Sequence, residues 1–402
     1  MDPSRVFVGP SNGTGGAELP LRVAFVITRL NIGGPALHVQ LLASRLDRAR
    51  YEVTVYTGRP SAREGDIRAL LPTAGVRIVE VPGLRREISP WHDLRALAAL
   101  LGAFRRERPD VVHTHMAKAG FIGRIAGRAA GTRIVLHTFH GNVLRGYFGW
   151  SRSTVFNWIE RLLTTISTRI VALSARQQQE LIRLRIASPM KIEQIPLGID
   201  LQPFLAPAEG RLRAELGLAP DVELIGTVAR LTHIKGIDVL IDAAVLVTER
   251  RPRVRFVVVG DGPSRDVLLQ RARDLGLAET VHFVGWRGDL SSVYADLDVV
   301  VLSSRNEGTP MSVIEAMAAA RAVVATSVGG VPDLMPDGTG VLVPPEDPRS
   351  LAAAIDRLLC QPAERAALGA AAREHVVRWH DAATMVDRHD RLYRRLAHDV
   401  GR

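Results

Sequence analysis

Cysteine, aromatic residues and long apolar stretches are all scarce in this chain of 402 residues. Its one cysteine, Cys360, has no partner for an internal disulfide, and the sequence has no cysteine-based metal spacing. Aromatic residues make up 5% of the chain, which argues against a surface that stacks nucleobases, and no nucleic-acid-binding motif is present. No apolar run approaches the roughly 20 residues that span a bilayer, and residues 1–20 lack the apolar core of a secretory signal. We therefore expect a cytoplasmic protein without nucleic acid as a partner.

The chain has the composition of a globular protein with an uneven charge. Hydrophobic residues make up 47% and charged residues 23%, which excludes a largely disordered chain. The formal net charge is +10, and the excess of Lys and Arg falls in residues 1–200. This asymmetry indicates that the first half faces an anionic partner, such as a membrane surface or an anionic substrate. The alternative is an arginine-rich chain without such a partner.

Short apolar runs rich in β-branched residues alternate with longer helical stretches along the whole chain. Continuous apolar strands separated by helices predict parallel sheets that are covered on both faces. Six runs lie in the first half of the chain and six in the second, so we expect two such sheets. The runs are 22–28, 52–57, 76–81, 110–115, 133–138, 169–174, 223–229, 255–260, 281–285, 298–304, 322–327 and 340–344.

A segment with Pro and Gly, residues 195–211, separates the two series of strands. The predicted fold class is therefore α/β, with two Rossmann-like domains of parallel sheet that face a central cleft. We expect a flexible tail at 1–20, a first domain at 21–196 and a second domain at 197–380. Ligands of open parallel sheets bind beyond the carboxyl ends of the strands, so functional residues should lie in the turns that follow strands.

Two cations lie close together in the segment ARLTHIKG of the second half. Arg230 follows a predicted strand, and Lys235 comes five residues later at the start of a predicted helix. Two cations beside a helix N-terminus are suited to hold a diphosphate and to stabilise the negative charge that develops when a phosphate departs. The alternative is a pair of solvated surface cations.

Two carboxylates flank the start of another predicted helix in NEGTPMSVIEAM. Glu307 lies in a loop and Glu315 lies eight residues later. A helix of that length would rise about 12 Å, too far for the paired carboxylates of a glycosidase but suited to holding two parts of a long ligand, such as a ribose diol and a sugar hydroxyl. Gly308, Thr309 and Met311 present backbone N–H groups where the helix begins. The alternative is two unrelated surface acids.

The turns of the first half carry glycine and histidine. Gly33 and Gly34 follow the first strand and would let the backbone approach a ligand, although the spacing is not that of a dinucleotide-binding motif. Four histidines follow the next strands, and we expect one of them, His115, to face the cleft and bond a sugar hydroxyl or a phosphate. A metal site lacks a nearby acid, and a structural role remains open for each. The other three are His113, His137 and His140.

Two further segments have a structural and a functional interpretation. Asp296 and Asp298 form a D-x-D pair that can bind a metal with a sugar nucleotide, but they open a buried strand, where capping is the expected role. Aromatic and arginine side chains alternate in residues 144–165. That segment is either an amphipathic helix packed on the core or a surface that docks on an anionic membrane.

Taken together, these motifs resemble the retaining glycosyltransferases of family 4, which have the GT-B fold. The resemblance covers roughly residues 20–400, and E-x7-E with its flanks and the Arg230/Lys235 pair are its most specific parts. The HTHMAKAG and HTFHG segments look most like bacterial enzymes that build exopolysaccharide, capsule or lipopolysaccharide. The motifs are GG at 33–34, HTHMAKAG at 113–120, HTFHG at 137–141, IPLGID at 195–200, ARLTHIKG at 229–236, GDGP at 260–263, VGW at 284–286, E-x7-E at 307–315 and VGGVPDL at 328–334.

The resemblance implies a role for each matching residue. Arg230 and Lys235 would hold the diphosphate of a nucleotide sugar, Glu315 the ribose and Glu307 the donor sugar. Gly33 and Gly34 would approach the donor phosphate or the acceptor, and His115 would line the sugar site. The base would lie near Gly285, Trp286 and Arg287, and a last helix at about 381–402 would return to the first domain. The sequence departs from the family at Ala320 and Ala322, where Gly and Pro are common, and an alanine in a left-handed helix cap would cost about 1 kcal/mol.

By this resemblance the protein is a retaining, metal-independent hexosyltransferase without a bound cofactor. It would move a sugar from a nucleotide sugar, with UDP as the expected nucleotide, to a saccharide or a polyprenyl-diphosphate-linked acceptor in the synthesis of a cell-surface polysaccharide. A peripheral contact with the inner face of the cell membrane would fit the basic first half. Two alternatives stay open: a sugar-nucleotide epimerase of the same architecture, and an inactive scaffold subunit that only binds a partner.

Overall fold

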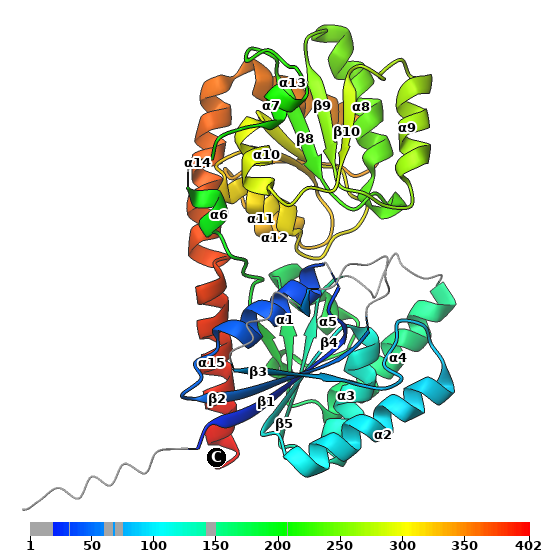
Figure 1. Cartoon of the computed structure of the whole chain (residues 1–402), viewed down its shortest axis with the longest axis vertical. Coiled ribbons are helices and arrows are strands. Elements are labelled where there is room, and N and C mark those ends of the chain that lie inside the picture. The colour runs from blue at the N-terminus through cyan, green and yellow to red at the C-terminus, as the bar shows by residue number, and fades with distance from the viewer. Residues whose placement is uncertain (1–18, 32, 60–66, 69–74, 142–149, 207) are drawn as a thin grey trace, which may run out of the picture.

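The computed structural model contains two parallel sheets, each covered by helices, stacked one above the other along the long axis (Figure 1). It describes residues 19–31, 33–59, 67–68, 75–141, 150–206 and 208–402. The predicted tail at 1–20 therefore lies almost entirely outside the described residues. Parallel strands joined by helices bury both faces of a sheet, which explains why the strands read as continuous apolar runs in the sequence.

The first sheet has seven strands in the order β3-β2-β1-β4-β5-β6-β7. β4 lies at its centre and pairs with β1, whose Val23 is level with Val53 of β2 and with Val111 of β4. The strands are β1 (Leu21–Arg29), β2 (Tyr51–Gly58), β3 (Val76–Glu80), β4 (Val111–His115), β5 (Ile134–Phe139), β6 (Arg169–Ala172) and β7 (Ile192–Gln194).

Helices cover both faces of this sheet. α1 (Gly34–Arg45) and α15 (Ala382–Asp399) share one apolar core with it, and α2 (Pro90–Glu107) and α3 (Ala117–Ala129) share the other. α4 (Trp150–Ile166) packs on α3, and α5 (Ala175–Arg183) follows β6. A buried ion pair joins α3 to α4, since the guanidinium of Arg124 donates to both carboxylate oxygens of Glu160 at 2.9 and 2.7 Å.

The second sheet has six strands in the order β10-β9-β8-β11-β12-β13. One of its faces is covered by α8, α9 and α13, and the other by α10, α11, α12 and α14. The strands are β8 (Leu224–Val228), β9 (Arg255–Val259), β10 (Val281–Gly285), β11 (Val299–Leu302), β12 (Ala322–Thr326) and β13 (Val341–Val343). The helices are α8 (Ile237–Arg250), α9 (Arg265–Asp274), α10 (Leu290–Asp296), α11 (Met311–Ala318), α12 (Val331–Leu334), α13 (Pro348–Cys360) and α14 (Pro362–Trp379).

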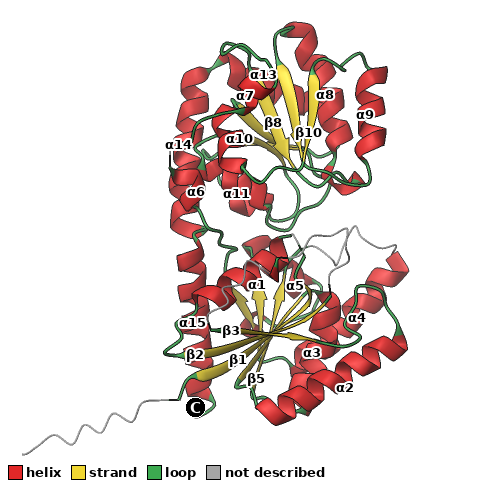
Figure 2. Cartoon of the chain, viewed as in Figure 1, coloured by secondary structure: helices red, strands yellow, loops and turns green. Residues whose placement is uncertain are grey.

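The chain passes twice between the two halves, and the passages lie side by side. Residue Ile199, on the way up to α6 (Gln202–Leu205) and α7 (Leu212–Glu215), pairs with Asp381, which lies between α14 and α15. α14 packs on the second sheet and α15 on the first, so the two successive helices run along one side of both halves (Figures 1 and 2).

The predicted fold class is confirmed: the structure has two Rossmann-like units of parallel sheet, and each of the twelve predicted runs coincides with a strand. The strand that sequence reasoning missed is β7, which has three residues and lies just before the predicted linker. Ala320 adopts the left-handed conformation expected of it, with φ of 55°.

Candidate functional site

A short ion pair at the carboxyl end of the second sheet joins two of the predicted residues. Lys235 ends a 3₁₀ turn (His233–Lys235) before α8, and its Nζ donates to Oε1 of Glu307 at 2.6 Å. The hydroxyl of Ser304 donates to the same oxygen at 2.7 Å. The Glu307 side chain is 8% exposed and that of Lys235 is 25% exposed, so the pair lies at the edge of the interior. The ammonium has three N–H donors, and this contact uses one of them.

Glycines let a second loop support the backbone of Glu307. Gly329 has a φ of +52°, and a Cβ there would collide with the carbonyl of Glu307. The amide of the next residue, Gly330, donates to the carbonyl of Gly308 at 3.1 Å. The VGGVPDL motif therefore fixes the loop that carries Glu307. Glycine is required at position 329 because a side chain there would collide with that loop.

The loop of Arg230 is supported in the same way by the GDGP motif. Gly260 has a φ of +126°, and a Cβ there would collide with the carbonyl of Ala229. The amide of Leu231 donates to the carbonyl of Asp261 at 3.0 Å. Arg230 itself is exposed at the end of β8. GDGP therefore holds the position of a cation-bearing turn.

Glu315 lies one turn into α11, and its carboxylate is bonded to a tyrosine. The hydroxyl of Tyr294 lies 2.9 Å from Oε2 of Glu315 and 3.1 Å from the carbonyl of Ser312. Burial raises the pKa of Glu315 to about 7, and the hydrogen bond from Tyr294 opposes that rise. Glu315 therefore titrates near neutral pH.

The first sheet reaches this region through two of its turns. The Cα of Gly34 faces α11, where a Cβ would lie 3.5 Å from the sulfur of Met311. A Cβ on Gly308 would lie 2.7 Å from the carbonyl of His140, which follows β5. The predicted residues Gly34, Gly308 and Met311 thus meet where the two halves contact each other.

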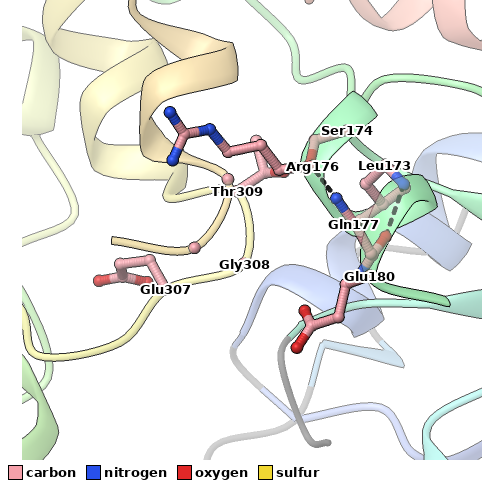
Figure 3. A pocket seen from close by; sticks show the side chains of 10 residues that line it. Leu173, Ser174, Arg176, Gln177, Glu180, Glu307, Gly308 and Thr309 are labelled. Carbon is pink, nitrogen blue, oxygen red and sulfur yellow. Dashed lines mark hydrogen bonds between the residues drawn. The ribbon is translucent and has the colours of Figure 1, made fainter. Parts of the chain in front are cut away.

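A pocket lies between the loop of Glu307 and the start of α5 (Figure 3). On one side it is lined by Glu307, Gly308 and Thr309, and on the other by residues that follow β6. The backbone amide of Gln177 donates to the hydroxyl of Ser174, which caps α5. Sequence reasoning missed this side of the pocket, although the rule that sites follow strands would have found it after β6. The residues on that side are Leu173, Ser174, Arg176, Gln177 and Glu180.

Beneath the cleft, five histidines from four segments of the chain form what we call the histidine cluster. Two of them, His113 and His115, lie on one face of β4, with ring centroids 4.4 Å apart. Strand alternation places His137 on the other face of the sheet, where it bonds the Thr114 hydroxyl at 2.9 Å. The cluster consists of His38, His113, His115, His140 and His389.

Hydrogen bonds tie parts of the cluster together and leave other parts unsatisfied. Nδ1 of His115 lies 2.8 Å from Nε2 of His140, and Nδ1 of His113 lies 2.7 Å from the Tyr393 hydroxyl. Both ring nitrogens of His38 are buried without a hydrogen-bond partner among the described residues. Burial lowers the pKa of every member below its ordinary value, to about 3 for His140 and about 4 for His389. The cluster is therefore neutral at physiological pH.

The expectation that His115 faces the cleft is wrong for this structure. Its side chain is fully buried and bonded to the ring of His140, and the part of His140 that lies against the loop of Gly308 is its backbone carbonyl. The reason is that α1 and α15 both cover this face of β4, and their histidines were not visible as neighbours in the sequence. Within the described ranges, no group of three or more His, Cys, Asp or Glu side chains is placed to hold a metal ion.

The remaining predicted residues lie at the carboxyl end of β10, the edge strand of the second sheet. Trp286 is 66% exposed. The guanidinium of its neighbour Arg287 is held between the carboxylates of Glu215 and Asp289, so its donors are already engaged. Gly285, with a φ of +73°, accepts a hydrogen bond from the Gly260 amide at 2.7 Å.

Of the two segments with a structural and a functional interpretation, the structure decides the role of Asp296 and Asp298. Asp298 accepts hydrogen bonds from Arg213 at 2.8 Å and from the Leu224 amide at 2.9 Å, and Asp296 accepts one from the Arg213 amide, which is the capping role. In the segment 144–165, residues 142–149 lie outside the described residues. Trp158 is 59% exposed on α4.

Family comparisons agree with this two-part architecture. Residues 33–198 match the model described as a glycosyl transferase 4-like domain, and residues 209–375 match the model described as glycosyl transferases group 1. The two matches fall on the first and the second sheet.

Curated relatives match most of the chain. A D-inositol 3-phosphate glycosyltransferase of Actinosynnema mirum is 32% identical over 85% of this chain and 88% of its own length. A UDP-Gal:alpha-D-GlcNAc-diphosphoundecaprenol alpha-1,3-galactosyltransferase of Escherichia coli is 34% identical over 63% of this chain and 67% of its own.

Solved structures share the fold. HepE of Anabaena in complex with UDP is 22% identical, with a TM-score of 0.77 over 92% of this chain and 99% of its own. Sucrose-phosphate synthase of Thermosynechococcus elongatus is 23% identical, with a TM-score of 0.80 over 94% of this chain and 99% of its own.

Proposed function

The chain belongs to the group 1 glycosyltransferases and has the GT-B fold, and from this premise we propose that it transfers a sugar from a UDP-sugar to a lipid-linked saccharide with retention of configuration. The observation that carries the proposal is the contact of Lys235 with Glu307 at the cleft, beside the backbone of Gly308. A cation, a carboxylate and backbone N–H groups in one place suit a donor that carries both a diphosphate and a sugar.

The choice of UDP as the nucleotide is supported by the relatives. The galactosyltransferase of Escherichia coli has a UDP-sugar in its name, and HepE has been solved with UDP and with UDP-glucose. In this proposal the carboxylate of Glu315 accepts the two ribose hydroxyls. Trp286, with its exposed ring, would lie beside the base, while Arg287 would support that segment through its two carboxylate partners.

In the proposed reaction the bond between the sugar C1 and the diphosphate oxygen breaks, and the acceptor hydroxyl attacks C1 from the same face. The acceptor proton passes to an oxygen of the departing phosphate. Lys235, Arg230 and the amides of Gly308 and Thr309 stabilise the negative charge that develops on the diphosphate, so no metal ion is required for that step. Glu307 accepts a sugar hydroxyl through the oxygen that Lys235 leaves open.

The first domain would complete the sugar site through its turns. Gly34 lies near Met311 of α11, and the backbone of Gly33 and Gly34 would approach the donor phosphate or the acceptor. The backbone carbonyl of His140 lies against the loop of Gly308, and His115 would hold this segment in position through its hydrogen bond to the His140 ring. His115 is thus proposed as a positioning residue in place of a direct ligand of the sugar.

The proposed acceptor is a saccharide on a polyprenyl diphosphate, since the Escherichia coli relative acts on a diphosphoundecaprenol. Such an acceptor would bring the first domain to an anionic membrane surface. None of the described helices combines the length and the apolar character that crossing a bilayer requires. The contact would therefore be peripheral and would use the surface of α2, α3 and α4.

Apolar side chains stand exposed on the outer faces of these three helices. Ile88 lies just before α2 and Trp91 and Leu94 lie in its first turns, at a spacing of three residues, and they are 90%, 82% and 58% exposed. Exposed arginines flank them at positions 85 and 95. Apolar anchors with flanking cations match an interface of anionic lipids. The other exposed apolar residues on this surface are Phe121, Val155, Trp158 and Leu162.

A transfer assay tests the function. Purified protein is incubated with UDP-sugars, with and without a polyprenyl-diphosphate-linked saccharide, and release of UDP and the configuration of the product are measured. We expect UDP release that depends on the acceptor and a product with the donor's anomeric configuration. An isomerised donor without acceptor would instead support an epimerase, and absence of donor binding would support a scaffold subunit.

A vesicle assay tests the membrane contact. Co-sedimentation with vesicles that contain anionic lipids is expected for the protein and should weaken about tenfold when Trp91 and Trp158 are both replaced by Ser. Val267→Ser is the matched control, because that side chain is 72% exposed on α9 of the second domain. Equal binding of all three proteins, or binding to neutral vesicles alone, would contradict the proposed surface.

A further inference from the structure

We propose that Tyr294 is a positioning residue of the donor site, which holds the carboxylate of Glu315 ionised and oriented toward the ribose diol of the nucleotide. The proposal rests on the proposed function, since it assumes that Glu315 contacts the ribose. Tyr294 would not contact the donor itself. It would set the pH above which Glu315 is ionised, and therefore the pH above which the nucleotide binds tightly.

The geometry around Tyr294 leaves its hydroxyl little freedom. The ring belongs to α10, is fully buried and packs edge-to-face with Phe204 at a centroid distance of 5.8 Å. Its hydroxyl lies 2.9 Å from Oε2 of Glu315 and 3.1 Å from the carbonyl of Ser312. A phenol has one proton to donate, and a carboxylate is the stronger acceptor, so the proton is directed to Glu315.

Glu315 has no cation to stabilise its charge among the described residues that pack around it. Arg373 of α14 donates to the carbonyl of Ala318, and Arg321 donates to the carbonyl of Leu297. Asp296, the acid on α10, is paired with Arg213. The strands β11 and β12 contribute apolar side chains and Thr326. The hydrogen bond from Tyr294 is therefore the contact that favours the ionised carboxylate over the protonated one.

Ionisation matters because a carboxylate accepts two hydroxyl hydrogen bonds at once, whereas a carboxylic acid uses one oxygen as a donor. Burial alone raises the pKa of Glu315, and the Tyr294 hydroxyl brings it back to about 7. Burial also keeps the pKa of Tyr294 well above its ordinary value, so the tyrosine stays a donor through the whole range in which Glu315 titrates. Removing the hydroxyl should move the Glu315 transition to higher pH.

The experiment compares the affinities for UDP and for 2′,3′-dideoxyuridine diphosphate between pH 6 and 9 by titration calorimetry. The second ligand lacks the diol, so the ratio of the two affinities isolates the ribose contact and removes the titration of the diphosphate itself. The variants are Tyr294→Phe, Glu315→Gln and the control Tyr51→Phe, which also loses a hydroxyl that donates to a carboxylate, that of Asp390 at 2.8 Å in the first domain.

In the wild type and in Tyr51→Phe, the ratio should rise with pH through a midpoint near 7. In Tyr294→Phe the midpoint should move up by about one unit, with an affinity for UDP about five- to tenfold weaker at pH 7 and recovering by pH 9. In Glu315→Gln the ratio should not change with pH. A merely structural role for Tyr294 would weaken both ligands equally at every pH.

The outcomes separate this proposal from the proposed function. If the wild type favours UDP over the dideoxy ligand with a pH-dependent ratio, and Tyr294→Phe has the same midpoint, the role of Tyr294 is overturned and the donor site stands. If the wild type does not distinguish the two ligands, or binds neither, the ribose contact of Glu315 is wrong and both proposals fail. Thermal unfolding of each variant controls for loss of fold.

Discussion

The two halves of the molecule differ in how many histidine and charged side chains they bury. The first domain buries them in its core: the histidine cluster, His137 and the Arg124–Glu160 pair all lie under helices. In the second domain, within the described residues from β8 to α14, the side chains that pack the sheet are mainly apolar, with buried hydroxyls at Thr227 and Thr326, and the buried carboxylate of Glu307 lies in a loop at the cleft. The buried histidines and the buried ion pair thus support the fold of the first domain, whereas the buried carboxylate of Glu307 lies at the proposed donor site of the second.

The difference predicts how the stability of each half changes when a buried side chain gains a proton or loses its charged partner. A histidine buried without a counter-charge stabilises a fold only while it is neutral, and a buried ion pair stabilises it only while both partners are present. The contact of Lys235 with Glu307 lies at the edge of the cleft, so its loss should affect ligands far more than folding. A change of pH or a substitution that affects one domain can therefore be compared with its effect on the other domain.

The largest expected effect is the loss of the first domain in mild acid. The pKa values of the six buried histidines in the cluster and at 137 are lowered by burial, so the unfolded chain takes up more protons than the folded one below about pH 6.5. Stability is thus complete above that pH and is lost as the pH falls, by about 1.4 kcal/mol per histidine for each pH unit once the unfolded state is protonated.

Hydrogen exchange read by mass spectrometry at pH 7.5 and pH 5.5, corrected for intrinsic rates, checks this prediction. Peptides that cover β4 should lose protection at pH 5.5, while peptides that cover β11 should keep theirs. Equal loss in both strands, or earlier loss in β11, would break the contrast between the domains.

The second largest effect is expected from opening the buried ion pair. Glu160→Ala leaves the fully buried guanidinium of Arg124 without its partner and should lower the free energy of unfolding by about 3–5 kcal/mol. Asp242→Ala breaks the exposed pair with Arg271 in the second domain and should cost less than about 1 kcal/mol. Urea denaturation measures both, and similar values for the two variants would refute the assignment.

Two lysine substitutions should separate activity from stability. Lys235→Ala should lower turnover about 10²–10³-fold with an unchanged melting temperature, because it removes a charge that stabilises the departing phosphate. Lys191→Ala in the first domain should leave turnover per folded molecule unchanged and lower stability by about 1–2 kcal/mol. Its Nζ donates to the carbonyls of Thr164 and Ser167 at the end of α4, at 2.8 and 3.0 Å. The reverse pattern would contradict the roles given to the two lysines.

The smallest effect concerns the second domain alone. Ala320 holds a left-handed conformation at the end of α11, where glycine carries no steric penalty. Ala320→Gly should therefore raise the free energy of unfolding by about 0.5–1 kcal/mol without changing turnover, and denaturant titration measures it. A loss of stability would mean that the alanine methyl packs favourably enough to offset the strain.

The sequence was most informative about features that depend on residues close together in the chain, such as strands and short motifs. Apolar runs predicted the strands because a parallel sheet buries both faces of each strand. The resemblance to family 4 assigned Lys235 and Glu307 to one nucleotide sugar, and the structure brings the two side chains into contact.

Contacts between distant segments could not be predicted in this way. His38 and His389 meet the histidines of β4 only because α1 and α15 pack on the same face of that strand, and a single sequence does not reveal that pairing. The same limit hid the bond of Tyr294 with Glu315 and the engagement of Arg287 by Glu215, since each joins elements whose relative position depends on the whole fold.

The most direct test of the account is a crystal structure of the protein grown with UDP at neutral pH. The account predicts that the diphosphate lies in the cleft with an oxygen about 3 Å from Nζ of Lys235, and that the ribose hydroxyls meet the carboxylate of Glu315. UDP bound outside the cleft, or bound there with Lys235 and Glu315 turned away from it, would contradict the central claim.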